Sequence, residues 1–78
     1  MSRKQVLSNI SQRIIELRES KGWNQSDLAR ACGKDRQAIQ KLESGIVNPT
    51  IYSLYEVAKA LDVTVSKLTQ NLEKGANS

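Results

Sequence analysis

The chain has 78 residues, of which 38% are apolar and 4% aromatic, so it is long enough for one small domain with an aliphatic core. A single cysteine excludes an internal disulfide, and the lack of histidine excludes a Cys/His metal cluster and histidine-based catalysis. We therefore expect no metal and no cofactor. Because no apolar run exceeds two residues and the start lacks the apolar core of a signal peptide, we expect a cytoplasmic protein without a membrane segment.

The net charge of +4 is unevenly distributed along the chain. Residues 1–41 contain nine Lys or Arg against four Asp or Glu, a charge of +5. Residues 42–78 contain three against four, a charge of −1. A basic first half suits a polyanionic partner such as nucleic acid, although an excess of basic residues is also common on ordinary soluble domains.

The first helix is predicted from Val6 to Lys21, after a basic segment over residues 1–5 that we expect to be a flexible N-terminus. One face of this helix holds Val6, Ile10, Ile14 and Leu17. Ile15 lies about 100° away from Ile14, so it is either exposed or part of a contact with another chain. Gly22 is the kind of residue that ends a helix in the left-handed conformation.

Two short helices around a tight turn are predicted in the middle of the chain. The first covers residues 25–31, and Asn24 has the chemistry of its N-cap. The second covers residues 36–44 and follows Asp35, another good N-cap. Gly33 lies between them and suits the positive φ that a three-residue turn of this kind requires.

The second of these helices separates its side chains by face, at about 100° per residue. One continuous arc of roughly 140° holds Arg36, Gln37, Gln40, Lys41 and Ser44. The opposite arc holds Ala38, Ile39 and Leu42, and Glu43 lies at the boundary. A face of long side chains with paired donors and acceptors is typical of a helix that binds a polar partner. Ordinary amphipathic surface helices also have a polar face, so this pattern alone does not distinguish a binding helix from a solvent-exposed one.

Two further helices complete the prediction. One runs from Ile51 to about Leu61, and the last runs from Val65 to about Leu72. Residues 73–78 are polar and are expected to form a disordered tail. No segment shows the alternating pattern of a strand, so the sequence predicts an all-α domain of five helices over residues 6–72.

These residues resemble the phage repressor and Cro type of helix-turn-helix domain, also called the xenobiotic-response-element family. The resemblance covers about residues 10–70 without a gap. The positions that carry it are Gln25, Leu28, Ala29, Gly33, Ile39, Leu42, Glu43, Gly45, Asn48, Pro49, Leu54, Ala58, Ala60, Leu61, Val63 and Leu68. It implies a compact five-helix lambda-repressor-like fold that binds double-stranded DNA.

The resemblance also implies roles for individual residues. The positions that meet base edges in the major groove are Arg36, Gln37, Gln40 and Lys41. The positions that meet backbone phosphates are Gln25, Ser44 and Asn48. Gln25 is further expected to brace the first residue of the recognition helix, and Arg18 and Glu43 to form an internal salt bridge.

The sequence departs from the family at two positions. Lys34 follows the turn glycine, where an apolar residue is usual, and it is expected either to contact a phosphate or to snorkel. Asp62 stands where the family often has glycine, which we expect to alter only the turn before the last helix.

One recognition helix contacts only a few base pairs, so a homodimer on an inverted-repeat operator is expected. The residues expected at the dimer interface are Tyr52, Tyr55, Val65 and Leu72. Val65 and Leu72 would serve equally well in the core of one chain.

The expected function is that of a sequence-specific transcriptional regulator. Two alternatives stay open: an antitoxin, which would add a toxin protein as partner, and the controller protein of a restriction–modification system. An enzyme is not expected, because no nucleophile–base pair can be assembled, and no small-molecule ligand is evident.

Overall fold

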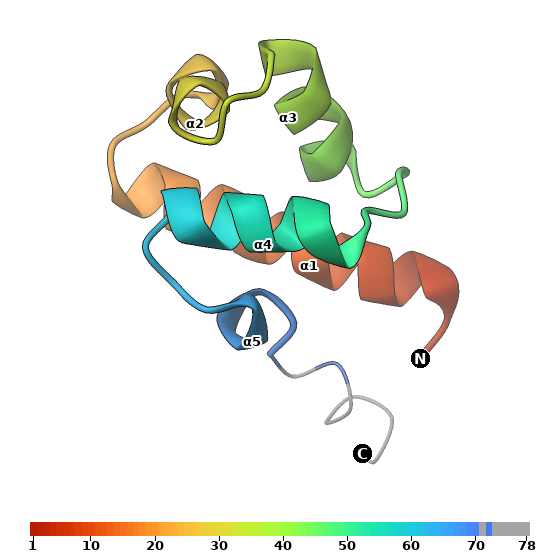
Figure 1. Cartoon of the computed structure of the whole chain (residues 1–78). Coiled ribbons are helices and arrows are strands. Elements are labelled where there is room, and N and C mark those ends of the chain that lie inside the picture. The colour runs from red at the N-terminus through yellow and green to blue at the C-terminus, as the bar shows by residue number, and fades with distance from the viewer. Residues whose placement is uncertain (71, 73–78) are drawn as a thin grey trace.

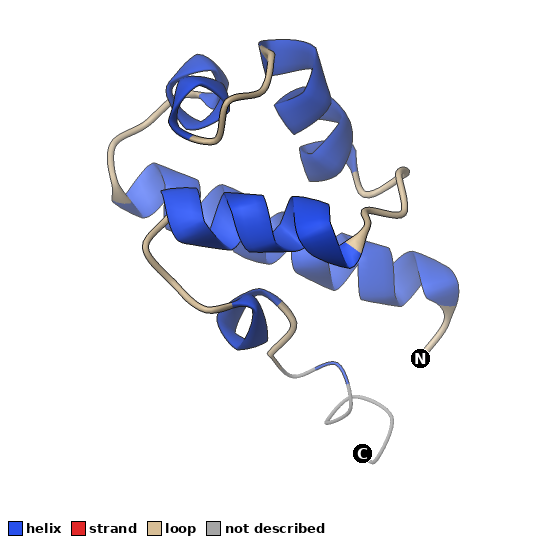
Figure 2. Cartoon of the chain, viewed as in Figure 1, coloured by secondary structure: helices blue, strands red, loops and turns tan. Residues whose placement is uncertain are grey.

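The structure, a computed structural model, describes residues 1–70 and 72. Helices are the only regular secondary structure in this part of the chain (Figure 2), which confirms the all-α prediction. The five helices are α1 (Arg3–Ser20), α2 (Gln25–Ala31), α3 (Arg36–Ser44), α4 (Ile51–Ala60) and α5 (Val65–Leu68).

Each helix begins after a residue whose side chain accepts a hydrogen bond from the backbone N–H three positions further on. These N-caps are Ser2, Asn24, Asp35, Thr50 and Thr64. The capping chemistry of the sequence therefore sets where every helix of the described part starts.

The predicted start of α1 is wrong by three residues, because residues 3–5 belong to the helix and not to a flexible segment. Ser2 Oγ accepts from the backbone N–H of Gln5 at 3.2 Å, and Gln5 Oε1 accepts from the backbone N–H of Ser2 at 2.9 Å. This reciprocal pair is a capping box, which satisfies two donors that a helix start otherwise leaves unpaired.

The predicted end of α5 is also wrong, because the helix stops at Leu68 and not near Leu72. The hydroxyl of Thr69 donates to the carbonyl of Val65 at 3.3 Å, a local bond of the kind by which Thr competes with helix propagation. Leu72 nevertheless packs against the core. The predicted tail, residues 73–78, lies outside the described residues.

The main helix contacts form a closed ring around one core. Helix α3 packs on α1 and α2, α2 also packs on α4, and α5 packs on both α4 and α1. In Figure 1, α1 and α4 cross the middle of the view, with α2 and α3 to one side and α5 to the other. The core side chains are Ile10, Ile14, Leu28, Ala29, Ile39, Leu54, Val57, Ala58, Leu61 and Leu68.

The apolar residues of α1 are placed slightly differently from the predicted stripe. Leu7 is buried, whereas Val6 and Leu17 are half-buried and pack against the core. Ile15 is half-buried. None of the helices in the described part combines the length and the apolar character needed to cross a bilayer.

Candidate nucleic-acid interface

Helices α2 and α3 are joined by the tight turn that the sequence predicts. Gly33 has a φ of +69°, and the backbone N–H of Lys34 donates to the carbonyl of Ala29 at 2.8 Å. The Ala29 side chain is itself 3% exposed, and its small size permits the close approach of neighbouring helices. The turn thereby sets the orientation of α3 relative to α2.

The outer face of α3 carries four exposed polar side chains, Arg36, Gln37, Gln40 and Lys41. Neither Arg36 nor Lys41 takes part in an ion pair with another residue of the described chain. On the opposite face Ile39 is fully buried. The helix therefore presents donor-rich side chains to solvent from a backbone that the core holds in place.

Glu43 anchors the inner face of α3 through a buried ion pair with α1. Arg18 Nε donates to Glu43 Oε2 at 2.7 Å and Arg18 Nη2 donates to Glu43 Oε1 at 3.0 Å. The two side chains are 11% and 4% exposed, and Arg18 Nη1 also donates to the carbonyl of Trp23 at 2.7 Å. This bidentate geometry is the strong form of a charge-assisted pair, and its hydrogen bond to Glu43 raises the pKa of Arg18. The structure thus brings together the two residues that the family resemblance implied.

Gln25 braces α3 at a different place from the one expected. Its Nε2 donates to Glu43 Oε1 at 2.9 Å, in the last turn of α3, whereas the expected bond was to Arg36 in the first turn. The buried carboxylate provides the stronger acceptor, because it is charged and has lone pairs left over from Arg18. Helices α1, α2 and α3 therefore meet at one acidic side chain, which the spacing in the sequence does not reveal.

Lys34 has a structural partner that the sequence did not indicate. Its Nζ lies 2.8 Å from Glu56 Oε1 on α4, and the hydrogen bond to Glu56 raises the pKa of Lys34. Lys34 therefore links the turn to α4 through an ion pair, and the phosphate contact expected for it stays a prediction. No signal in the sequence connects these residues, since they are distant along the chain and meet only where α4 packs on α2.

Two further phosphate candidates lie at the end of α3. The hydroxyl of Ser44 donates to the carbonyl of Lys41 at 2.6 Å and accepts from the backbone N–H of Ile46 at 3.3 Å. Asn48 is exposed in the loop that follows. Asn48 is thus free to donate, whereas Ser44 would have to rotate its hydroxyl away from Lys41.

The residues expected at a dimer interface lie on one side of α4 and α5. Tyr52 and Tyr55 are 68% and 49% exposed, and their rings stack with centroids 6.2 Å apart. Tyr55 also lines a groove of about 390 Å³ with Val65, which is half-buried. Leu72 is half-buried against the core. The tyrosines therefore offer more surface to a partner than Val65 and Leu72 do.

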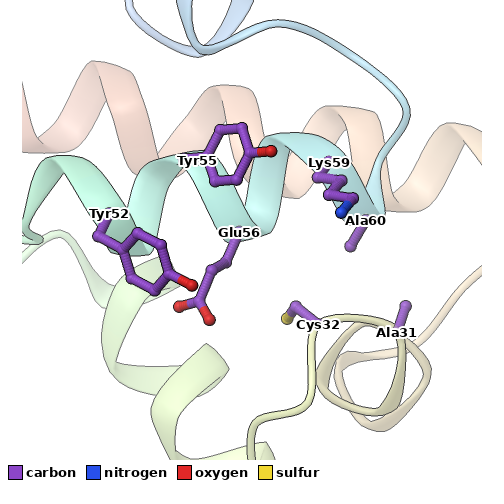
Figure 3. Close-up of a pocket in the computed structure, with 7 residues that line it drawn as sticks. All are labelled: Ala31, Cys32, Tyr52, Tyr55, Glu56, Lys59 and Ala60. Carbon is purple, nitrogen blue, oxygen red and sulfur yellow. The ribbon is translucent and has the colours of Figure 1, made fainter.

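A hollow of about 490 Å³ separates the end of α2 from α4, with Cys32 on one side and Tyr52 and Tyr55 on the other (Figure 3). The Cys32 thiol donates to the carbonyl of Leu28 at 3.0 Å, and burial raises its pKa. A thiol with a raised pKa is a poor nucleophile, which agrees with the role of a small packing residue.

A short helix, a tight turn and a second helix with a free polar face define a helix-turn-helix domain. The chain belongs to the helix-turn-helix family HTH_3, which matches residues 14–68. The predicted xenobiotic-response-element type is confirmed, and the chain is a DNA-binding domain of the transcription-regulator class, not an enzyme.

Several named proteins are similar to this chain in sequence or in fold. The HTH-type transcriptional regulator y4dJ of Sinorhizobium fredii is 40% identical over 62 residues, which cover 80% of this chain and 75% of that protein. SinR of Bacillus subtilis is 37% identical over 60 residues, which cover 76% of this chain and 54% of SinR. The structure of the restriction–modification controller protein C.AhdI of Aeromonas hydrophila matches with a TM-score of 0.80 and 32% identity, covering 87% of this chain and 99% of that one.

Proposed function

We propose that the protein regulates transcription by binding a specific double-stranded DNA site as a homodimer, with α3 in the major groove. The observation that supports this most directly is the contrast between the two faces of α3. Arg36 and Lys41 are exposed and free of ion pairs in the described chain, whereas Glu43 on the other face is buried and bonded to two other helices. A rigid backbone with free donors on one face is what sequence recognition in a groove requires.

The chemistry of the four outward side chains suggests which bases they contact. Arg36 and Lys41 can donate to O6 and N7 of guanine, and Gln37 and Gln40 can pair with N6 and N7 of adenine. Carboxylates, which would be repelled by phosphates, are absent from this face of α3. We therefore assign direct contact with base edges to these four residues.

The phosphate contacts are proposed for residues at both ends of the helix-turn-helix unit. Gln25 at the start of α2 keeps one amide hydrogen after donating the other to Glu43. Ser44 and Asn48 flank the far end of α3. Contacts of this kind position a protein on the duplex without selecting its sequence.

Selection of bound duplexes from a random pool, followed by titration of variants, tests the proposed function. Gln37→Ala and Lys41→Ala should each cost about 1–3 kcal/mol on the selected site and relax the base preference at one position. Gln12→Ala is the control, because Gln12 is an exposed polar residue of α1 outside the helix-turn-helix unit. Equal affinity of the wild type for the selected site and for random duplex would refute sequence-specific binding.

A homodimer is proposed because one recognition helix contacts too few base pairs for useful selectivity. The exposed stacked tyrosines, Tyr52 and Tyr55, and the groove that Tyr55 shares with Val65 support an interface on α4 and α5. Leu72 would contribute only its exposed part. A two-fold axis there would set the recognition helices roughly 34 Å apart, and the operator would be an inverted repeat.

A role as the controller of a restriction–modification system is favoured by one comparison in particular, because the chain covers 99% of the controller C.AhdI. An antitoxin would bind DNA through the same face of α3, so a toxin partner would add to the proposed function. Identifying the neighbouring genes and the bound chromosomal sites would distinguish a restriction–modification controller from an antitoxin. A regulator of transcription must reach the chromosome, so we propose the cytoplasm as its location.

A further inference from the structure

The charges in the first turn of α1 are arranged against the preference of a helix. A helix favours acidic residues in its first turn, but α1 has none there and carries Arg3 and Lys4 instead. The first fifteen residues contain no Asp or Glu at all, and both acidic residues of α1, Glu16 and Glu19, lie in its C-terminal half. In the described chain neither Arg3 nor Lys4 forms an ion pair. The two cations therefore do not stabilise the helix that carries them.

The fold places these cations beside the end of the recognition helix. Gly45 ends α3 and packs so closely on α1 that a Cβ added to it would lie 3.2 Å from Ser11 Oγ and 3.6 Å from Ser8 Cα. Lys4 precedes Ser8 by four residues and so shares its face of α1, about 6 Å further along the axis. The N-terminal end of α1 and the loop after α3 lie on the same side of the molecule in Figure 1.

A groove of about 510 Å³ joins these parts. Its lining residues, besides Gly45, are Arg3, Lys4, Leu7, Ser8, Ser44 and Ile46. Ile46 is 78% exposed and supplies the accessible apolar surface of this groove. The groove, which we call the basic groove, thus combines two free cations with apolar surface.

We infer that the basic groove binds the sugar–phosphate backbone of the DNA next to the bases that α3 contacts. This inference rests on the proposed function and extends the interface to a second helix. A DNA strand alternates charged phosphates with apolar deoxyribose rings, which matches cations set beside the exposed side chain of Ile46. Ser44 links the groove to the proposed phosphate contacts of α3, so one strand can pass from one set of contacts to the other.

Charge reversal separates this role from a structural one. Lys4→Glu and the double variant Arg3→Glu/Lys4→Glu should unfold at the same temperature as the wild type or higher, because acidic residues suit a helix start. On the site selected by the wild type, the same variants should bind at least about ten-fold more weakly. The slope of log K against log salt should fall by about one for each lost phosphate contact. A purely structural role would move stability and binding in the same direction.

Gln12→Glu provides the control, because it also adds a negative charge at an exposed position of α1, but outside the basic groove. It should change the salt slope much less than Lys4→Glu. A second arm compares the selected site with and without flanking base pairs. The wild type should lose affinity on the trimmed duplex, and the double variant should be insensitive to trimming.

The outcomes distinguish this inference from the proposed function. If the wild type prefers its selected site but the double variant has the same affinity and salt slope, only the inference about the basic groove is wrong. If the wild type shows no preference for any sequence, the proposed function itself fails. Vesicles containing phosphatidylserine test whether the basic groove binds an anionic membrane surface and not DNA. Binding to them that Lys4→Glu abolishes, with an unchanged DNA salt slope, would overturn the assignment to DNA.

Discussion

At the scale of single residues, Glu43 connects the most distant parts of the recognition unit. Its carboxylate accepts three hydrogen bonds, two from Arg18 on α1 and one from Gln25 on α2. A buried ion pair is no automatic gain in stability, since both groups lose their hydration. Removing one partner is costly all the same, because the other charge is then left buried and unpaired.

Glu43→Ala is therefore expected to lower the free energy of unfolding by on the order of 3 kcal/mol. Chemical denaturation of Glu43→Ala, Arg18→Ala and the double variant gives the measurement. The double variant should lose clearly less than the sum of the two single variants, because it leaves no unpaired charge. Additive losses would show that the two residues are not coupled.

At the scale of elements, the turn between α4 and α5 contains local strain. Asp62 has a φ of +61° and is the one non-glycine residue in the described chain with a positive φ. An L residue in the left-handed region is disfavoured relative to glycine, although Asp tolerates it better than most. The departure from the family pattern at this position therefore raises the conformational energy of the turn.

Asp62→Gly is expected to raise the free energy of unfolding by about 0.5–1 kcal/mol, because glycine adopts this φ without strain. Gly33→Ala is the matched control, since Gly33 has a φ of +69° and a Cβ added there would meet nothing within 4 Å. It should lower stability by about 1 kcal/mol through conformation alone. Destabilisation by Asp62→Gly, measured by thermal unfolding, would contradict the strain argument.

At the scale of the whole molecule, the proposed dimer depends on the surface of α4. Tyr55 is the residue of choice for a test, because it is half-exposed and lines the groove with Val65. Leu72 is a poorer choice, since it packs against the core and its replacement would also affect folding.

Sedimentation of the protein at tens of micromolar should show a dimer for the wild type and a monomer for Tyr55→Glu. The variant should also bind the inverted repeat more weakly than the wild type, while both bind a half-site equally. Gln12→Glu, at an exposed position of α1, serves as the control for added charge. A monomeric wild type that binds a half-site as tightly as the full repeat would refute the dimer.

Much of this protein is determined locally and is visible in the sequence. Helix starts depend on a cap and the residues just after it, so Asn24 and Asp35 could be assigned correctly as N-caps. The polar face of α3 follows from helical geometry alone. The capping box at Ser2 is equally local, and it is the signal that places the start of α1 correctly.

The tertiary structure alone decided which polar side chains are free and which are paired. The pairing of Lys34 with Glu56, the pairing of Gln25 with Glu43 and the approach of Lys4 to the end of α3 all join residues from different elements of the fold. Such pairs carry no period or spacing in the sequence, because helix packing brings them together only after each helix has formed. The sequence by itself therefore determined the five helices and the polar face of α3. The packing of α1 and α4 against α2 and α3 determined which side chains lie beside that face.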